Sequence, residues 1–151
     1  MLNKKYVRNL TSQHKFIDHT ADIAVEITAD SFEELIQESL IAFNESVLDS
    51  VDKKSEEELE IDLKDSSKEG ILVSFLNEIN YLLTVKRWIS KSIYETVLKK
   101  EKNNFELCCK IKGSQLTDGI DLKEEIKSVT YHQMEIKEEN GKFFTRIVFD
   151  I

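Results

Sequence analysis

The chain has 151 residues, of which 40% are apolar and 33% charged, and it carries a net charge of −8 with a pI of about 5.0. One domain with its own core is expected at this length, and tight direct binding to nucleic acid is not, because phosphate backbones repel an acidic surface. No apolar run approaches the ~20 residues of a membrane span, and residues 1–12 lack the apolar core of a secretory signal, so we expect no membrane association. The only two cysteines are adjacent and poorly suited to a disulfide, which indicates a reducing, cytoplasmic location.

The N-terminal part of the chain divides at about residue 14. Residues 1–14 are predicted to form a flexible arm, and residues 15–151 a single domain. Lys15–Ile17 and Ile23–Thr28 have the apolar and β-branched residues of strands. The polar residues 18–22 interrupt them.

Two helices are predicted from capping patterns that precede apolar residues at helical spacing. Ser31 and Glu34 form a capping box, in which the serine hydroxyl accepts a backbone N–H and the glutamate reaches back to the cap. The apolar spacing then continues to about Leu48. A second pattern, Ser66-Ser-Lys-Glu69, precedes a wide apolar stripe that predicts a largely buried helix over Lys68–Thr84.

The remaining elements are strands, predicted from alternating apolar residues and turn signals. They are Leu59–Leu63, Ile93–Leu98, Phe105–Ile111, Ile126–Tyr131, Met134–Glu138 and Phe143–Phe149. Asn140-Gly141 is the strongest hairpin signal, and residues 49–58 and 113–125 are polar enough to be loops. We therefore expect an α+β fold, with the two main helices packed on the same antiparallel-rich β-sheet.

A cluster of polar residues lies between the first two predicted strands. Asp18, His19, Thr20 and Asp22 fall within five positions, and a helix-like turn would place Asp22 beside Asp18 or His19. One interpretation is a turn in which an aspartate caps backbone amides. The others are a metal site and a catalytic site, and the residues alone leave all three open.

A second candidate site is the end of the last strand, Asp150 and Ile151. The Asp150 side chain and the terminal carboxylate of Ile151 place two negative groups next to each other. Nearby carboxylates repel, and a bound cation relieves the repulsion. The alternative is an ordinary strand that runs to the last residue.

The other reactive residue types are weaker indications of chemistry. His132 is interpreted as a surface residue, a core residue or a base, and Trp88 as a core residue. Cys108 and Cys109 are neighbours in a strand and point to opposite faces, which predicts one buried and one half-exposed thiol without a disulfide. The chain has no Gly-x-Ser-x-Gly motif and only four glycines, which argues against a phosphate-binding loop.

Three segments, in this order, resemble the archease family. His19-Thr-Ala-Asp22-Ile23-Ala24 matches the motif HTADIG, and Ile71-Leu-Val-Ser-Phe-Leu-Asn-Glu78 matches a helix of the pattern Leu-Leu-x-x-Phe/Trp-Leu-Asn/Glu-Glu. Lys127-Ser-Val-Thr-Tyr-His132 matches K-A-x-T-Y-H, and a hairpin and a final Asp-Ile follow it, as in the family. The order and spacing over residues 15–151 make the resemblance specific.

The resemblance implies a metal site and a protein partner. In archeases the aspartate of HTAD, the penultimate aspartate and the terminal residue surround a divalent metal, so the implied ligands are Asp22, Asp150 and Ile151. Hard oxygen ligands suit Ca²⁺, the first expectation, or Mg²⁺ or Mn²⁺, rather than Zn²⁺. Archeases are cofactors rather than enzymes. They promote GTP-dependent guanylylation and multiple turnover of an RtcB-type RNA ligase in tRNA splicing and RNA repair.

The chain departs from the family pattern in two places, and two other functions stay open. Ala24 stands where the family has glycine, and the loop before the third motif lacks the Gly-Glu and histidine of many members.

One alternative function is a general chaperone-like binding module, in which the metal only holds the C-terminus. The other is a metal-dependent hydrolase or phosphoesterase that uses Asp18, His19, Asp22 and His132.

Overall fold

The computed structural model describes residues 12–17, 21–52, 57–131 and 134–151. Over these residues the chain forms two α-helices and eight β-strands. In chain order they are β1 (Gln13–Ile17), β2 (Asp22–Ala29), α1 (Phe32–Val47), β3 (Glu57–Asp65), α2 (Lys68–Thr84), β4 (Trp88–Glu101), β5 (Asn104–Gln115), β6 (Ser128–Val129), β7 (Lys137–Glu139) and β8 (Lys142–Asp150).

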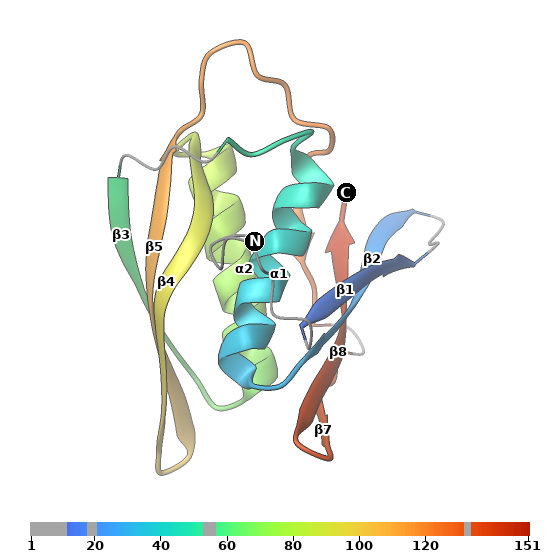
Figure 1. The fold of residues 1–151 in the computed structure, drawn as a ribbon, viewed down its shortest axis with the longest axis vertical. Helices are drawn as coiled ribbons and strands as arrows, with labels where there is room; N and C mark the ends of the chain where they lie inside the picture. Colours follow the sequence, from blue (N-terminus) through green and yellow to red (C-terminus); the bar gives the residue numbers. More distant parts are fainter. Residues whose placement is uncertain (1–11, 18–20, 53–56, 132–133) are drawn as a thin grey trace, which may run out of the picture.

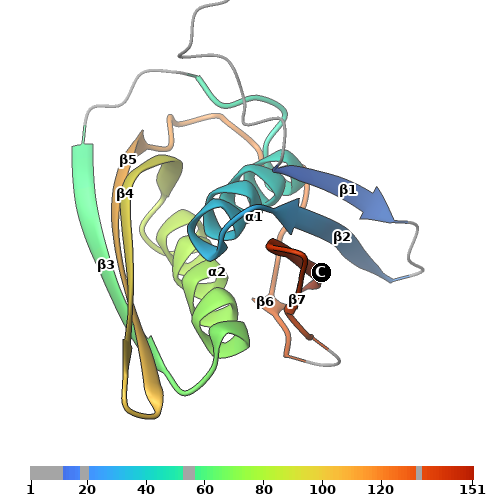
Figure 2. The ribbon, with the colours of Figure 1, turned by 60° about the horizontal axis from the view of Figure 1, so that its bottom comes forward.

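The strands form two antiparallel sheets, one on each side of the helix pair (Figure 1 and Figure 2). The first sheet has the order β1-β2-β8-β6, with β7 also paired to β8, and the second sheet has the order β3-β5-β4. The α+β fold expected from the sequence is confirmed, and both helices contact the second sheet. The first sheet covers their other side, an arrangement that the sequence pattern does not indicate.

Helix α2 is buried on several sides because it belongs to the middle layer. Its consecutive residues Ile71, Leu72 and Val73 are all buried, and consecutive helix residues point in directions about 100° apart. A helix packed on a single sheet buries only one stripe, so this burial requires both sheets.

Trp88, at the start of β4, is also buried, as predicted. Neither helix in the described part of the chain has the length and apolarity to cross a membrane.

Helix α2 spans Lys68–Thr84, as predicted, and the two helices differ only in how well the sequence predicts their caps. Ser31 caps α1 as predicted. Helix α2 is capped by Ser67 instead of Ser66, and the Ser67 hydroxyl accepts the N–H of Gly70 at 3.0 Å. The Asp65 carboxylate accepts the N–H of Ser67 at 3.0 Å, and this local turn moves the cap by one residue.

Several strand boundaries also differ from those predicted. β1 begins at Gln13, two residues before the expected start, and β5 continues through Gly113, which was predicted to begin a loop. The predicted strand Ile126–Tyr131 is reduced to the two residues of β6. The hairpin is confirmed: Asn140 and Gly141 connect β7 to β8 with φ angles of 53° and 76°.

Candidate functional site

Asp22 and Asp150 lie directly opposite each other on the first sheet. Asp22 is the first residue of β2 and Asp150 the last residue of β8, and the antiparallel register makes them Cα partners. The next pair, Ile23 and Phe149, packs into the core. Because neighbouring residues in a strand point to opposite faces, both aspartates point away from the helices. We call this pair the acidic rung.

The acidic rung combines two like charges where β2 begins and β8 ends. Directly opposite residues in an antiparallel pair have Cβ atoms about 4.5–5.5 Å apart, and like charges at this spacing destabilise the sheet. Asp150 is exposed and Asp22 half-buried, so a cation has access to both. Their carboxylate oxygens are the donors that hard divalent cations prefer, so the residues fit such an ion.

Strand β6 holds Asp150 from the side opposite to β2. The N–H of Lys127 donates to the carbonyl of Asp150 at 2.7 Å, and Val129 pairs with Phe149. The side chain of Asn77 on α2 in turn binds the backbone of Val129. The last residues of β8 are therefore held by both neighbouring strands and, through β6, by the helix layer.

The third predicted ligand, Ile151, follows Asp150 directly, and its side chain packs against the core. This contact keeps the main chain of Ile151 next to the acidic rung. The structure thus brings Asp22 and Asp150 together and places Ile151 beside them, while ligation of a metal stays a prediction. Four further candidates lie outside the described residues: Asp18, His19, Thr20 and His132.

A pocket of about 360 Å³ borders the inner face of β2, and its lining includes Phe16, Ile23, Glu45 and Lys123. Ile23 faces the helices, whereas the neighbouring Asp22 faces away from them. The pocket therefore opens on the side of the sheet opposite to the acidic rung. A hydrolase that uses Asp22 needs a cleft around that residue, and this pocket does not provide one.

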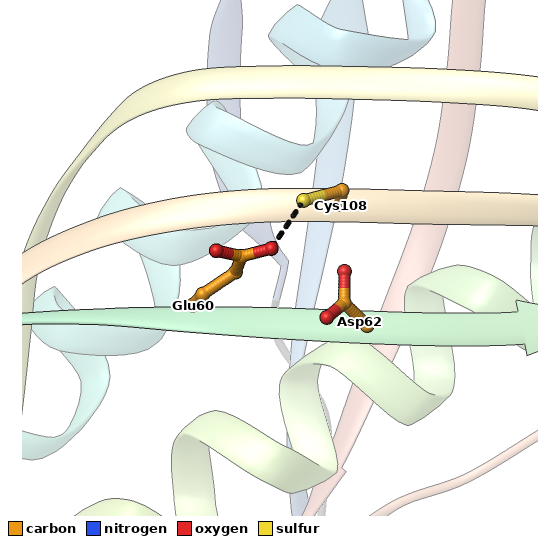
Figure 3. Close-up of side chains that lie close together, drawn as sticks. All are labelled: Glu60, Asp62 and Cys108. Carbon is orange, nitrogen blue, oxygen red and sulfur yellow. Dashed lines mark hydrogen bonds between the residues drawn. The ribbon is translucent and has the colours of Figure 1, made fainter.

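A second group of potential ligands lies on the second sheet and is not predicted from the sequence. The ligand atoms of Glu60, Asp62 and Cys108 lie within 4.8 Å of one another (Figure 3). Asp62 and Cys108 are Cα partners in β3 and β5, and Glu60 shares a face of β3 with Asp62. The acidic alternation of β3 is visible in the sequence, but the register that brings Cys108 to it is not.

The Cys108 thiol in this group donates a hydrogen bond to Glu60, with Sγ 3.1 Å from Oε1. Hydrogen bonds to the Glu60 and Asp62 carboxylates, which favour the neutral thiol, raise the pKa of Cys108 to about 12. A metal must displace this proton to bind the sulfur. Burial raises the pKa of Cys109 to about 12, and the predicted pair of one buried and one half-exposed free thiol is confirmed.

The fold is shared with proteins of known structure. The solution structure of protein 1598 from Methanobacterium thermoautotrophicum matches with a TM-score of 0.79 at 23% identity, over 91% of this chain and 98% of that chain. The crystal structure of an archease from Thermotoga maritima, described as a possible chaperone, matches with a TM-score of 0.60 at 29% identity, over 91% and 96% of the two chains. The class is therefore that of α+β proteins with an archease-like fold.

Sequence comparison identifies the family within this class. Residues 14–151 match the model of the Archease protein family (MTH1598/TM1083). The archease of Pyrococcus abyssi is 30% identical over 138 residues, which are 89% of this chain and 95% of that protein. The archease of Methanosarcina barkeri is 26% identical over 140 residues, 92% and 96% of the two chains. The chain belongs to the archease family, as the sequence motifs predict.

Proposed function

We propose that this chain is a non-enzymatic activator of an RtcB-type RNA ligase in the cytoplasm. It promotes GTP-dependent guanylylation and multiple turnover of the ligase in tRNA splicing and RNA repair. Family membership supports the proposal, and the structural observation that carries it is the position of Asp22 directly opposite Asp150. The net charge of −8 favours a protein partner over direct, tight binding to RNA.

The acidic rung is proposed to hold a divalent cation together with a main-chain oxygen of Ile151. Ca²⁺ is the first choice, because it accepts about six to eight oxygen ligands in flexible geometry. Mg²⁺ and Mn²⁺ prefer the same oxygen donors. When bound, the cation supplies a positive charge that stabilises an anionic group of the ligase or of its nucleotide.

The contribution of the chain's own residues is to position these oxygens. Asp22 and Asp150 are held on adjacent strands in one register, with Ile23 and Phe149 anchoring the same stretch of backbone in the core. Because the carboxylates point away from the helices, a partner reaches them without displacing core residues. The acidic rung is thus a rigid, outward-facing contact surface.

The proposal is tested with a turnover assay of an RtcB-type ligase and GTP, with and without this chain. Multiple turnover is expected only when both the chain and a divalent cation are present. Asp150→Asn, which removes one charge at constant side-chain size, is expected to lose the activation. Asp118→Asn, on the exposed loop between β5 and β6, is the matched control. Full activation by Asp150→Asn contradicts a role for the acidic rung, and GTP hydrolysis by the chain alone favours a hydrolase.

A second candidate function is that of a general chaperone-like binding module, which the description of the Thermotoga maritima archease favours. A module of this kind protects unrelated clients as well as a ligase. Aggregation of a heat-denatured unrelated enzyme, followed by light scattering with and without this chain, separates the two functions. Suppression of that aggregation together with an unchanged ligase turnover supports the second candidate.

A further inference from the structure

The pocket on the inner face of β2 combines apolar and acidic side chains. It has a volume of about 360 Å³ and is lined by Phe16, Ile23, Glu45, Ser46, Lys123 and Glu124. We propose that this pocket receives an arginine side chain from a basic surface of a protein partner. The inference rests on the proposed function, because the partner is the RNA ligase, and it adds no ligand to the acidic rung.

Phe16 presents an aromatic ring to this pocket. The register pairs Phe16 with the fully buried Val25, so the ring points toward the helix layer. It packs edge-to-face with the imidazole of His14 at a centroid distance of 5.5 Å, yet Phe16 stays 42% exposed. Ile23, on the neighbouring strand, is also only partly buried. The pocket therefore offers apolar surface that a partner side chain can cover.

The two glutamates of the pocket are positioned by contacts of the fold. Glu45 lies on α1, and its Oε2 is 2.6 Å from His14 Nε2, while half of its side chain stays exposed. Lys123 donates its backbone N–H to the carbonyl of Val47 at 2.8 Å, which holds the neighbouring Glu124 beside the end of α1. Glu124 is exposed, so both carboxylates are accessible from solvent.

An arginine side chain suits this combination of groups. Its guanidinium stacks on an aromatic ring and donates hydrogen bonds to carboxylates, and its methylene groups cover apolar surface. The described lining residues include two glutamates and one lysine, which give the pocket a net charge of −1. This charge favours a cationic side chain over an anionic one.

The position of the pocket favours a protein as the source of this arginine. Ile23 follows Asp22 directly, so the pocket and the acidic rung lie at the same end of β2, on opposite faces of the sheet. A partner that covers this end of the strand contacts both features. Aromatic rings and arginines are enriched in the cores of protein interfaces, and the net charge of −8 favours a basic partner surface.

The first test uses a small probe and needs no ligase. Two-dimensional NMR of the isotope-labelled protein follows a titration with N-acetylarginine amide, and N-acetylcitrulline amide is the uncharged control of similar shape. The arginine probe is expected to shift the amide signals of Phe16, Ile23 and Glu124 and to bind roughly tenfold more tightly than the control. Equal binding of the two probes, or shifts spread over the whole acidic surface, overturns the inference.

The second test compares two charge reversals in full-length protein. Glu124 and Glu125 are exposed neighbours, and of the two only Glu124 lines the pocket. Glu124→Lys and Glu125→Lys change the net charge equally, but Glu124→Lys is expected to weaken calorimetrically measured ligase binding roughly tenfold more. Phe16→Ala is expected to weaken it roughly tenfold as well, with Ca²⁺ affinity unchanged. Equal affinities of the two lysine variants overturn the inference.

The outcomes separate this inference from the proposed function. If the wild type activates the ligase and the two lysine variants bind it equally, the role of the pocket is wrong and the proposed function stands. If the wild type does not bind the ligase but takes the arginine probe into the pocket, the ligase is wrong as the partner and the arginine site stands.

The chain's own N-terminal arm is the other possible occupant, because residues 1–11 contain Lys4, Lys5 and Arg8. A full-length variant with Lys4→Ala, Lys5→Ala and Arg8→Ala is titrated with the same arginine probe. Equal probe affinity of this variant and the wild type supports docking of a partner. Probe binding by the variant alone shows that the arm fills the pocket, and this result overturns the inference.

Discussion

The side-chain amide of Asn77 closes a hydrogen-bonded ring with the backbone of Val129. The N–H of Val129 donates to Asn77 Oδ1 at 2.9 Å, and Asn77 Nδ2 donates to the Val129 carbonyl at 3.2 Å. Asn77 lies on α2 and Val129 on β6, the strand that flanks the end of β8. One side chain therefore satisfies both backbone groups of an edge-strand residue and joins the helix layer to the strand next to Asp150.

Asn77→Ala is expected to lower the free energy of unfolding by about 2 kcal/mol, because it removes two hydrogen bonds worth about 1 kcal/mol each. Urea denaturation followed by circular dichroism measures the change. Asn103→Ala, in the exposed turn between β4 and β5, is the control and is expected to have little effect. Equal stability of the two variants would show that the ring does not hold β6 in solution.

Because Asp22 and Asp150 form a like-charged pair, Asp150→Asn is predicted to raise the free energy of unfolding without a bound cation and to lower it, relative to the wild type, when a cation is present. In a chelator, Asp150→Asn is expected to raise the free energy of unfolding by less than about 1 kcal/mol, because it removes a like-charge cross-strand pair. With Ca²⁺ at about one hundred times its Kd, the wild type gains about 2.7 kcal/mol and the variant does not. Thermal or urea unfolding in both buffers measures this reversal, with Asp118→Asn as the control. A variant less stable than the wild type in chelator contradicts the repulsion.

Cys108 is predicted to be an unreactive thiol despite its partial exposure. Its pKa is raised to about 12 by hydrogen bonding to Glu60 and Asp62, so roughly one thiol in ten thousand is ionised at pH 8, and only the thiolate reacts. Glu60→Ala removes an acceptor and a negative charge, which lowers the pKa and is expected to speed alkylation by iodoacetamide. Mass spectrometry of the alkylated peptide measures the rate.

Two further thiol measurements complete this experiment. Glu58 lies two residues before Glu60, on the same face of β3. Glu58→Ala is therefore the matched control and is expected to leave the rate of Cys108 alkylation unchanged. Cys109 is fully buried and is expected to react only after unfolding. Alkylation of wild-type Cys108 at the rate of a free cysteine would overturn the predicted pKa.

The imidazole of His14 on β1 contacts two glutamates of α1. Its Nδ1 lies 2.6 Å from Glu38 Oε1, and its Nε2 lies 2.6 Å from Glu45 Oε2. The side chain of Glu38 is only 2% exposed, so His14→Ala removes a hydrogen-bond partner from a buried carboxylate and is expected to cost about 2 kcal/mol of stability. Lys15→Ala, the next residue on the exposed side, is the control. The measurement is urea denaturation.

A double variant distinguishes this contact from a simple loss of packing. If Glu38 is destabilised by losing His14, then His14→Ala combined with Glu38→Ala costs less than the sum of the two single changes. Additive costs would mean that the two side chains contribute independently.

The local elements could be predicted because their signals lie within a few residues. The Ser31 cap, the apolar spacing of α2 and the hairpin at Asn140-Gly141 each depend on neighbours along the chain. Helix α2 begins at Lys68 as predicted, but its cap is Ser67 instead of Ser66, because contacts outside the pattern compete for the same groups. The carboxylate of Glu69, expected to reach back to the cap, instead accepts the N–H of Ile136 at 3.0 Å.

The candidate site was predictable only through the family resemblance. From the residues alone, the polar cluster around Asp22 could be a turn, a metal site or a catalytic site. The strand end at Asp150 could be a cation site or an ordinary end of a strand. The motifs linked the two aspartates, and the register of β2 and β8 then placed them opposite each other. Nothing local in the sequence indicates that Phe16 and Glu124 line one pocket, because they lie in segments far apart in the chain.

By itself, the sequence determined the two helices, the hairpin, the family and the acidic character of the surface. Only the tertiary structure decided that two sheets enclose the helices, that Asp62 faces Cys108 and that Asp150 lies between Asp22 and Ser128. Helix signals arise within one or two turns of the same segment. Strand register depends on a partner far away in the sequence, and a slip of one residue moves every side chain to the other face of the sheet.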